Sequence, residues 1–120
     1  MNYTIGEAAK LNGLTISQLR YYDNQGLLPF LKRTPKGDRV FDHDALKFLN
    51  LILCLKDTGM PIKEIKQFVD WSMVGTQHTP KRLVMIKQHE QNVLEKMREM
   101  EENVKKIRQK IARLESEIQG

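Results

Sequence analysis

The sequence predicts a mainly α-helical protein, with a winged helix-turn-helix near its N-terminal end and a long coiled-coil helix at its C-terminal end. The first part rests on two short helical segments joined by a tight turn over 5–24, followed by a segment rich in turn residues over 27–41. The second part rests on apolar residues that recur at alternating spacings of four and three over 93–118.

Length and composition limit what kind of protein this is. With 120 residues, of which 29% are charged and 40% apolar, the chain has room for one compact domain and an appendage. No apolar run approaches the roughly 20 residues that cross a bilayer, and the N-terminus lacks the features of an export signal. The single cysteine excludes an intramolecular disulfide framework. We therefore expect a cytoplasmic protein without a membrane partner.

Two short helices open the chain. Thr4 and Glu7 have the spacing of a capping box, which predicts a helix over 5–11 that an Asn-Gly pair ends. A second helix is predicted to begin within 15–17, with Ser17 as its N-cap or a first-turn residue, and to end near Asn24, before a glycine. Two short helices with a glycine in the turn between them are the helix-turn-helix pattern.

The next segment cannot be helical throughout, because it contains two prolines and a glycine. The turn sequence Pro-Lys-Gly-Asp at 35–38 separates two short segments, 28–33 and 39–41, that are able to pair as a hairpin. A hairpin that follows a helix-turn-helix is a wing, so we place the wing at about 28–41.

A third and a fourth helix are predicted over 42–71. Asp42 caps the third helix, which ends at a Thr-Gly pair, and Pro61 takes the first position of the fourth, which ends near Trp71. A linker over 72–78 follows. The predicted first domain therefore spans 1–75.

The predicted last helix, over 79–119, has Thr79 as its cap and Pro80 at its first position. Its apolar stripe consists of Val93, Met97, Met100, Val104, Ile107, Ile111, Leu114 and Ile118. A helix of this length is about 60 Å long, more than a domain of this size can cover. A second copy of the same helix is the expected partner, in an orientation that the flanking charges leave open. A bent helix that folds back on its own domain is the alternative.

Side chains that suit DNA gather in the second helix and the hairpin. Arginine forks onto guanine and glutamine onto adenine in the major groove, while tyrosine hydroxyls bind phosphates. These roles favour Gln18, Arg20, Tyr21 and Tyr22. The alternative is that one of the two tyrosines packs in the core with its hydroxyl at the edge. The net charge of +5 fits a polyanionic partner. An ordinary solvated surface explains that excess equally well, but explains the wing's basic cluster less well. That cluster consists of Lys32, Arg33, Lys36 and Arg39.

The sequence here resembles the MerR family of bacterial transcription regulators. The resemblance rests on the run Thr4-Ile5-Gly6-Glu7-Ala8-Ala9 and on Leu14-Thr15-Ile16-Ser17-Gln18-Leu19-Arg20-Tyr21-Tyr22-Asp23-Asn24-Gln25-Gly26-Leu27-Leu28. Further matches are Arg33, Arg39-Val40-Phe41, Asp44, Leu46 and Thr58-Gly59-Met60-Pro61-Ile62-Lys63-Glu64-Ile65. It spans residues 3 to about 75, and the coiled coil agrees in position and length. Phe41 stands where the family usually has tyrosine, so a phosphate contact at that position is in doubt.

The resemblance implies a mechanism. Such regulators are homodimers, paired through an antiparallel coiled coil, on a pseudo-palindromic operator inside a promoter whose spacer is too long. They activate by bending and untwisting the DNA. The expected partners are promoter double-stranded DNA, a second copy of the chain and RNA polymerase. The expected DNA contacts are Thr15, Ser17, Gln18, Arg20, Tyr21, Arg33, Lys36 and Arg39.

The sequence offers fewer candidate residues for sensing a signal than for binding DNA. Members that bind large ligands carry a further C-terminal domain, and metal-sensing members have cysteines near the end of the coil. No cysteine follows Cys54 here, and His78 and His89 are too few for a metal site, so we expect no metal and no cofactor.

Cys54 falls on the polar side of the third helix, where a nearby lysine would favour the thiolate. The run 52–60 resembles the branch of the family that responds to aldehydes and related electrophiles through one cysteine in this helix, which suggests a role in stress response. The alternative is that this small residue fills a gap between helices.

Two other functional classes compete. An architectural DNA-binding protein would share the winged helix, but it has less need of a long coil that sets the spacing of half-sites. An enzyme using Cys54 would need a histidine and an acid in a pocket, which the sequence does not offer. We therefore expect no enzymatic activity.

Overall fold

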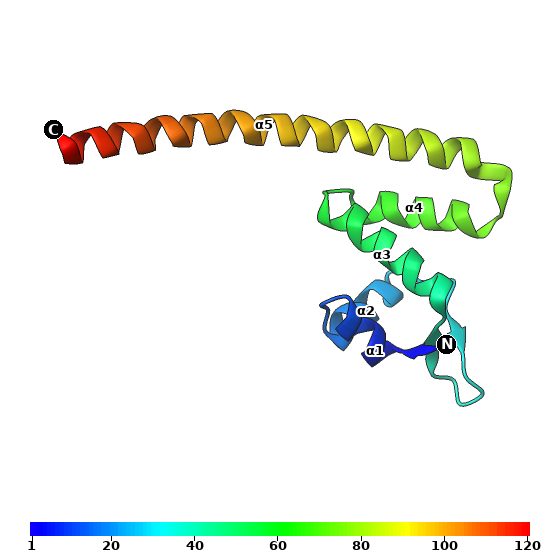
Figure 1. Ribbon diagram of the computed structural model, residues 1–120. Coiled ribbons are helices and arrows are strands. Elements are labelled where there is room, and N and C mark those ends of the chain that lie inside the picture. Colours follow the sequence, from blue (N-terminus) through cyan, green and yellow to red (C-terminus); the bar gives the residue numbers. More distant parts are fainter. The chain divides into compact units, whose positions relative to one another are not determined.

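The computed structural model describes residues 1–120, and it confirms a mainly α-helical chain with an N-terminal helix-turn-helix and a long C-terminal helix (Figure 1). The elements are β1 (Tyr3–Thr4), α1 (Ile5–Leu11), α2 (Ile16–Asn24), β2 (Lys32–Arg33), β3 (Arg39–Phe41), α3 (His43–Asp57), α4 (Ile62–Met73), the 3-10 helix η1 (Thr76–His78) and α5 (Thr79–Gln119). The chain consists of two compact units, Met1–Met85 and Ile86–Gly120.

Both helices of the helix-turn-helix begin with a capping box. In α1, the Thr4 hydroxyl accepts the Glu7 N–H at 3.1 Å, and the Glu7 carboxylate accepts the Thr4 N–H at 2.9 Å. In α2 the same reciprocal bonds join Thr15 and Gln18 at 3.1 and 2.9 Å. Thr15 is therefore the N-cap of α2, and Ser17 is the first-turn residue of the two roles expected for it.

The wing is the outer part of a three-stranded antiparallel sheet with the order β1-β3-β2. The turn closes where Gly37, at φ +90°, donates its N–H to the Thr34 carbonyl at 2.8 Å. The strands are shorter than predicted, because 28–31 are not extended into the ladder and only Lys32–Arg33 pair with β3. Strand β1 was not predicted, since two residues carry no period that a sequence pattern reveals.

The core of the first unit holds the sheet against the helices. Phe41 of β3 is fully buried and pairs in register with Tyr3, and β3 packs on α1 and α3. The other largest fully buried side chains are Leu19, Leu27, Leu28, Leu49, Ile52, Ile65 and Val69. They come from α2, the following loop, α3 and α4, so one core fixes all the elements around the helix-turn-helix.

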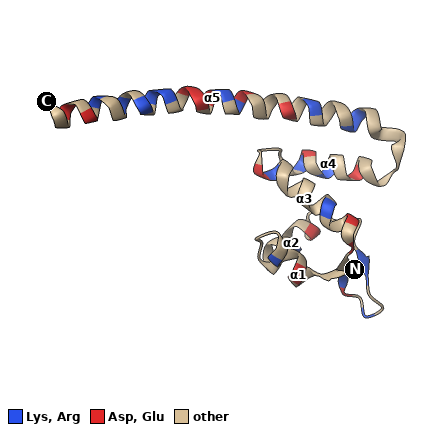
Figure 2. Ribbon diagram, in the orientation of Figure 1, with Lys and Arg blue, Asp and Glu red and all other residues tan.

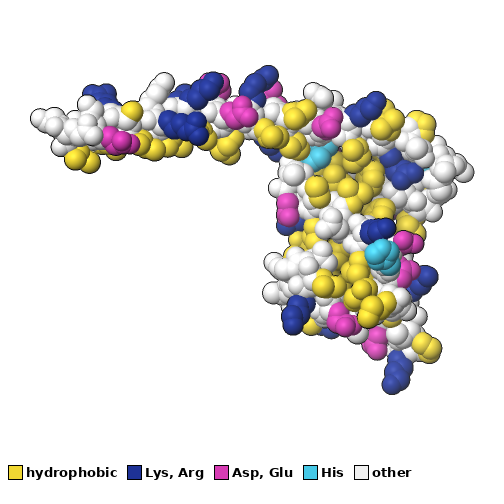
Figure 3. Space-filling view, in the orientation of Figure 1, with side chains coloured by type: hydrophobic (Ala, Val, Ile, Leu, Met, Phe, Trp, Pro, Cys, Tyr) yellow, Lys and Arg dark blue, Asp and Glu magenta, His cyan; other side chains and the backbone are white.

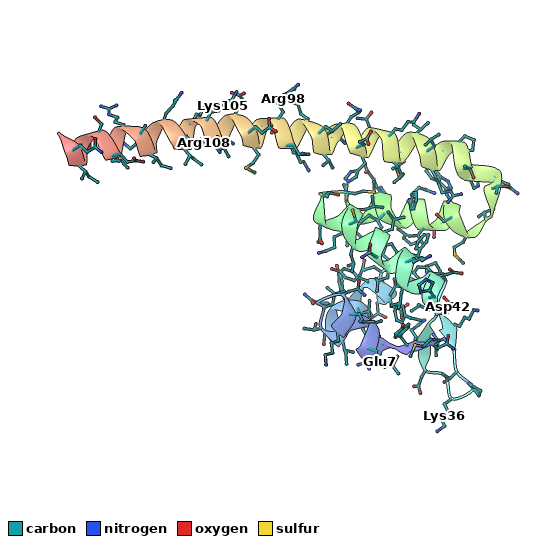
Figure 4. All side chains as sticks on the ribbon, viewed as in Figure 1. Glu7, Lys36, Asp42, Arg98, Lys105 and Arg108 are labelled. Atoms are coloured by element: carbon teal, nitrogen blue, oxygen red, sulfur yellow. The ribbon has the colours of Figure 1, made fainter.

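The third and fourth helices differ from the predicted span of 42–71 at their ends. Asp42 caps α3, as expected, by accepting the Ala45 N–H at 2.8 Å (Figure 4). Pro61 is the N-cap of α4 rather than its first helical residue, and α4 continues two residues past Trp71 to Met73. These shifts lie at helix ends, where a proline or a terminal apolar residue fits either side of the boundary.

The predicted linker over 72–78 is shorter and partly structured. After Gly75, whose φ is +92°, η1 leads directly into α5, so Thr79 is a helical residue instead of a cap. The start of α5 is bonded to α4, because the Arg82 guanidinium donates to Ser72 at 3.4 Å. The compact unit accordingly extends to Met85, and the predicted division into 1–75 and 79–119 remains a prediction.

Helix α5 runs unbroken for 41 residues, and hydrophobic side chains line one edge of it (Figure 3). It has no buried residue, and its large apolar side chains are at least 45% exposed at Leu94, Met97, Met100, Ile107, Ile111, Leu114 and Ile118. None of the helices combines the length and the hydropathy that a membrane span requires.

The Asp42 cap predicts a pH-dependent contribution to stability. The hydrogen bond from the Ala45 N–H, with help from Lys32, holds the pKa of Asp42 below its ordinary value of 3.8. A lowered pKa means that the contribution is fully present above the unfolded-state value and is lost as the pH falls through the folded-state value. Asp42→Ala should therefore lower the melting temperature at neutral pH, and its deficit should narrow as the pH falls below 3.8.

Thermal unfolding between pH 7 and pH 2, followed by circular dichroism, measures this deficit. Asp38→Ala, which removes an exposed carboxylate from the hairpin turn, is the matched control and should show no comparable deficit. A deficit for Asp42→Ala that stays constant across the pH range would contradict the assignment.

Candidate nucleic-acid interface

Helix α2 presents a polar face and buries an apolar one. Leu19 is fully buried and Tyr22 is 5% exposed, while Tyr21 is 53% exposed. The two tyrosine rings meet edge to face at 5.9 Å between centroids. Of the two tyrosines, Tyr22 is therefore the core residue, and its ring supports Tyr21, whose hydroxyl is free to reach a phosphate. Ser17 and Arg20 are also exposed.

The first turn of α2 has less freedom than its sequence suggests. The side-chain oxygens of Thr15 and Gln18 accept each other's backbone N–H groups in the capping box. Each side chain keeps a donor, the Thr15 hydroxyl hydrogen and the Gln18 amide NH₂. Because the Gln18 oxygen already accepts the Thr15 N–H, a bidentate contact with adenine would have to share that oxygen between the cap and the base.

The hairpin carries basic side chains, which appear in blue around the strands and turn in Figure 2. Lys36 lies at the tip of the turn (Figure 4) and is exposed. Arg33 is exposed in β2, and its guanidinium donates to the Gly37 carbonyl at 3.5 Å. Lys32 lies 3.3 Å from the Asp42 carboxylate, an ion pair between β2 and the cap of α3. Arg33 and Lys36 thus keep free donors for phosphates.

Arg39 is placed differently from the other wing cations. Its Nε lies 2.5 Å from Oδ2 of Asp23, near the end of α2, and the two side chains are 31% and 10% exposed. The guanidinium is therefore engaged within the protein through its Nε. Nothing in the local sequence pattern around Asp23 identifies a partner sixteen positions along the chain.

An open groove lies beside α2, lined by Ser17, Gln18, Tyr21, Tyr22, Lys56 and Ile62. Lys56 Nζ lies 5.6 Å from the centroid of the Tyr22 ring. A hydrogen bond with Tyr22 raises the pKa of Lys56. The ammonium group of Lys56 therefore adds positive charge next to the exposed face of α2.

Cys54 lies on α3 with its side chain exposed. Its neighbours Leu53 and Leu55 are buried, as helical geometry places them on the inner side. An exposed thiol is accessible to a small reagent in solution.

The apolar stripe of α5 is the other candidate binding surface. Met97, Met100 and Val104 line a shallow groove, with Glu101, Lys105 and Arg108 at its borders. Val93 and Val104 are half-exposed, and the other predicted interface residues are exposed. An uncovered apolar stripe on a long helix is typical of a surface that packs against a partner.

Known proteins share both the sequence and the fold. The family model described as MerR HTH family regulatory protein matches residues 3–70, and the one described as MerR, DNA binding matches residues 46–110. A helix-turn-helix-type transcriptional regulator of Haemophilus influenzae is 35% identical over 112 residues, which cover 93% of this chain and 83% of that protein. The regulator AdhR of Bacillus subtilis is 30% identical, over 76% of this chain and 65% of its own length.

Two solved structures have the same architecture. A MerR family transcriptional regulator from Bacillus thuringiensis superposes with a TM-score of 0.89 at 60% identity, covering 94% of this chain and 99% of that chain. HiNmlR, a MerR family regulator lacking the sensor domain and bound to promoter DNA, gives a TM-score of 0.88 at 35% identity, covering 93% and 89%. With the winged helix-turn-helix and its exposed basic face, these matches show that the chain belongs to the MerR family of DNA-binding transcription regulators.

Proposed function

We propose that this regulator binds a pseudo-palindromic operator within a promoter as a homodimer, and activates transcription by bending and untwisting an over-long spacer. The homodimer is inferred from the apolar stripe of α5, none of whose residues is buried in the single chain. The DNA-bound state of HiNmlR, a relative described as lacking a sensor domain, supports a promoter as the target.

The stripe suits a second copy of the same helix. Its alternating spacings of three and four keep the apolar residues on one seam when two helices supercoil. Self-pairing would join two recognition helices in one molecule, which is what an operator with two half-sites requires. Following the family resemblance, we propose that the two helices run antiparallel.

In this assembly α2 would enter the major groove, with Arg20, Ser17 and Tyr21 on its exposed face. Arg33 and Lys36 of the wing would bind the phosphate backbone beside the groove. RNA polymerase at the same promoter would be the further partner, and regulation would proceed in the cytoplasm without an enzymatic step.

Footprinting on the DNA beside the gene, with purified protein, tests the proposal. We expect protection inside a promoter spacer that is longer than the polymerase prefers. Arg20→Gln should weaken operator binding by about 10- to 100-fold, because it removes a forked base contact. Arg33→Gln should weaken binding to all sequences and lower the salt slope by about one.

The matched control is Arg98→Gln on α5, which removes one exposed arginine outside the winged helix and should leave the footprint unchanged. Protection that lies outside any promoter spacer would overturn the activation mechanism. An unchanged affinity in Arg20→Gln would overturn the assignment of α2.

The dimer is tested by Ile107→Asp. The carboxylate falls in the middle of the stripe, where burial between two helices would leave it without a partner. We expect sedimentation to show monomers and the footprint to be lost at concentrations at which the wild type protects two half-sites. Gln109→Asp, on the opposite side of α5, adds the same charge and should still form dimers. Dimers of normal stability in Ile107→Asp would contradict the proposed seam.

Cys54 is the proposed switch. Its exposed thiolate would add to the carbonyl carbon of an aldehyde, and the carbonyl oxygen would take up a proton, so that a bulky polar group is attached to α3. The resemblance of 52–60 to the electrophile-responsive branch supports this role, while a packing role is the alternative.

In vitro transcription with and without a carbonyl electrophile separates these roles. Cys54→Ser should abolish the response and keep operator binding, and Asn50→Ser, on the same side of α3 one turn earlier, should respond like the wild type. An unchanged response in Cys54→Ser would refute the switch.

A further inference from the structure

The ion pair between Asp23 and Arg39 joins the recognition helix to the wing. Arg39 is the first residue of β3, and Asp23 lies in the last turn of α2. The Nε to Oδ2 distance is 2.5 Å, and the carboxylate side chain is only 10% exposed. A carboxylate in this position is poorly solvated, so its charge depends on the guanidinium for compensation.

Asp23 lies at the end of α2, where a negative charge is unfavourable without a cation beside it. The C-terminal end of a helix carries partial negative charge, and α2 has no basic residue in its last turn. A carboxylate there is unfavourable by itself. The cation that offsets it comes from a different element, so the end of α2 and the start of β3 are held together by charge.

The ladder of the wing explains why Arg39 is available for this contact. Arg39 and Phe41 are two positions apart in β3 and so project to the same face of the strand, and Phe41 is fully buried. Arg39 therefore projects from the face of β3 that packs on the core. Val40, between them, projects to the other face.

The pairing of Arg39 with Arg33 is a second reason for Arg39 to form an ion pair with Asp23. These two residues are directly opposite each other in the β2–β3 ladder. Like charges in a cross-strand pair destabilise a sheet unless one of them is compensated. Asp23 compensates the charge of Arg39, which leaves the exposed Arg33 as the arginine of this pair whose charge has no carboxylate partner.

We propose that Arg39 is a positioning residue that does not contact DNA: through Asp23 it fixes the wing relative to α2, so that the base-reading helix and the phosphate-binding hairpin engage one half-site together. This replaces the role of DNA contact predicted for Arg39 from the sequence. The proposal rests on the proposed operator binding for its effect on DNA, but the ion pair itself is a property of the free protein.

Asp23→Asn gives opposite results under the two roles of Arg39. If Arg39 binds phosphate, removal of a nearby negative charge strengthens binding to any DNA. If Asp23 holds the wing in place, the same change weakens operator binding, by about tenfold, while binding to unrelated DNA is kept or strengthened. Asp38→Asn is the matched control, since it removes an exposed carboxylate next to Arg39 and should only strengthen binding slightly.

The salt dependence of binding gives a second readout. Arg39→Gln should weaken operator binding by about tenfold without changing the slope of log K against log salt, whereas loss of a phosphate contact lowers that slope by about one. The double variant Asp23→Asn with Arg39→Gln should be no weaker than either single variant, because both remove the same interaction. Arg39→Lys keeps the charge and should recover part of the affinity.

Hydrogen exchange in the free protein separates a failure of this proposal from a failure of the proposed function. The hairpin amides, such as that of Thr34, should exchange faster in Asp23→Asn and in Arg39→Gln and should be unchanged in Asp38→Asn, with helical circular dichroism retained in all three. If the variants show this pattern of exchange but the wild-type protein gives no operator footprint, only the proposed function is refuted. Stronger operator binding in Asp23→Asn, or a salt slope lowered by about one in Arg39→Gln, refutes the positioning role.

Discussion

The burial of Phe41 is the contact on which the DNA-binding unit depends. This ring lies at the end of β3, where the sheet meets α1 and α3, and it is fully enclosed. A hairpin of two or three residues per strand is not stable in water by itself. Anchored by Phe41, the wing becomes part of the core, and its turn can carry exposed positive charge at no cost to packing. A tyrosine at this position, which is usual in the family, would place its hydroxyl at the edge of the same enclosed ring.

Ion pairs add to the packing contacts that hold the wing. Two ion pairs connect the hairpin to helices, Lys32 to the cap of α3 and Arg39 to the end of α2. The Lys32 ammonium stays largely exposed in its pair, whereas the Arg39 side chain is mostly covered. The basic cluster that stands out in the sequence is thus divided: Lys32, Arg33 and Lys36 face solvent, and Arg39 is turned toward the protein.

Most of the fold was predictable because its signals are local. Capping residues, glycine turns and helical periodicity act over three or four positions, and they placed α1 and α2 and the extent of α5 closely. The errors lie at boundaries and in short elements. Strand β1 has two residues, and the end of α4 together with the 3-10 helix η1 takes up most of the segment predicted as a linker. Their conformation depends on neighbours that are distant in sequence.

By itself, the sequence determined the kind of protein: a winged helix-turn-helix with a polar recognition helix, and a long amphipathic helix with an uncovered stripe. Tertiary structure decided which of the candidate side chains are free. It placed Tyr22 in the core and Tyr21 outside, occupied the Gln18 oxygen in a cap, and paired Arg39 with Asp23. The physical reason is that periodicity encodes which face of an element is buried, whereas the partner of a charge is set by the meeting of elements that no local pattern specifies.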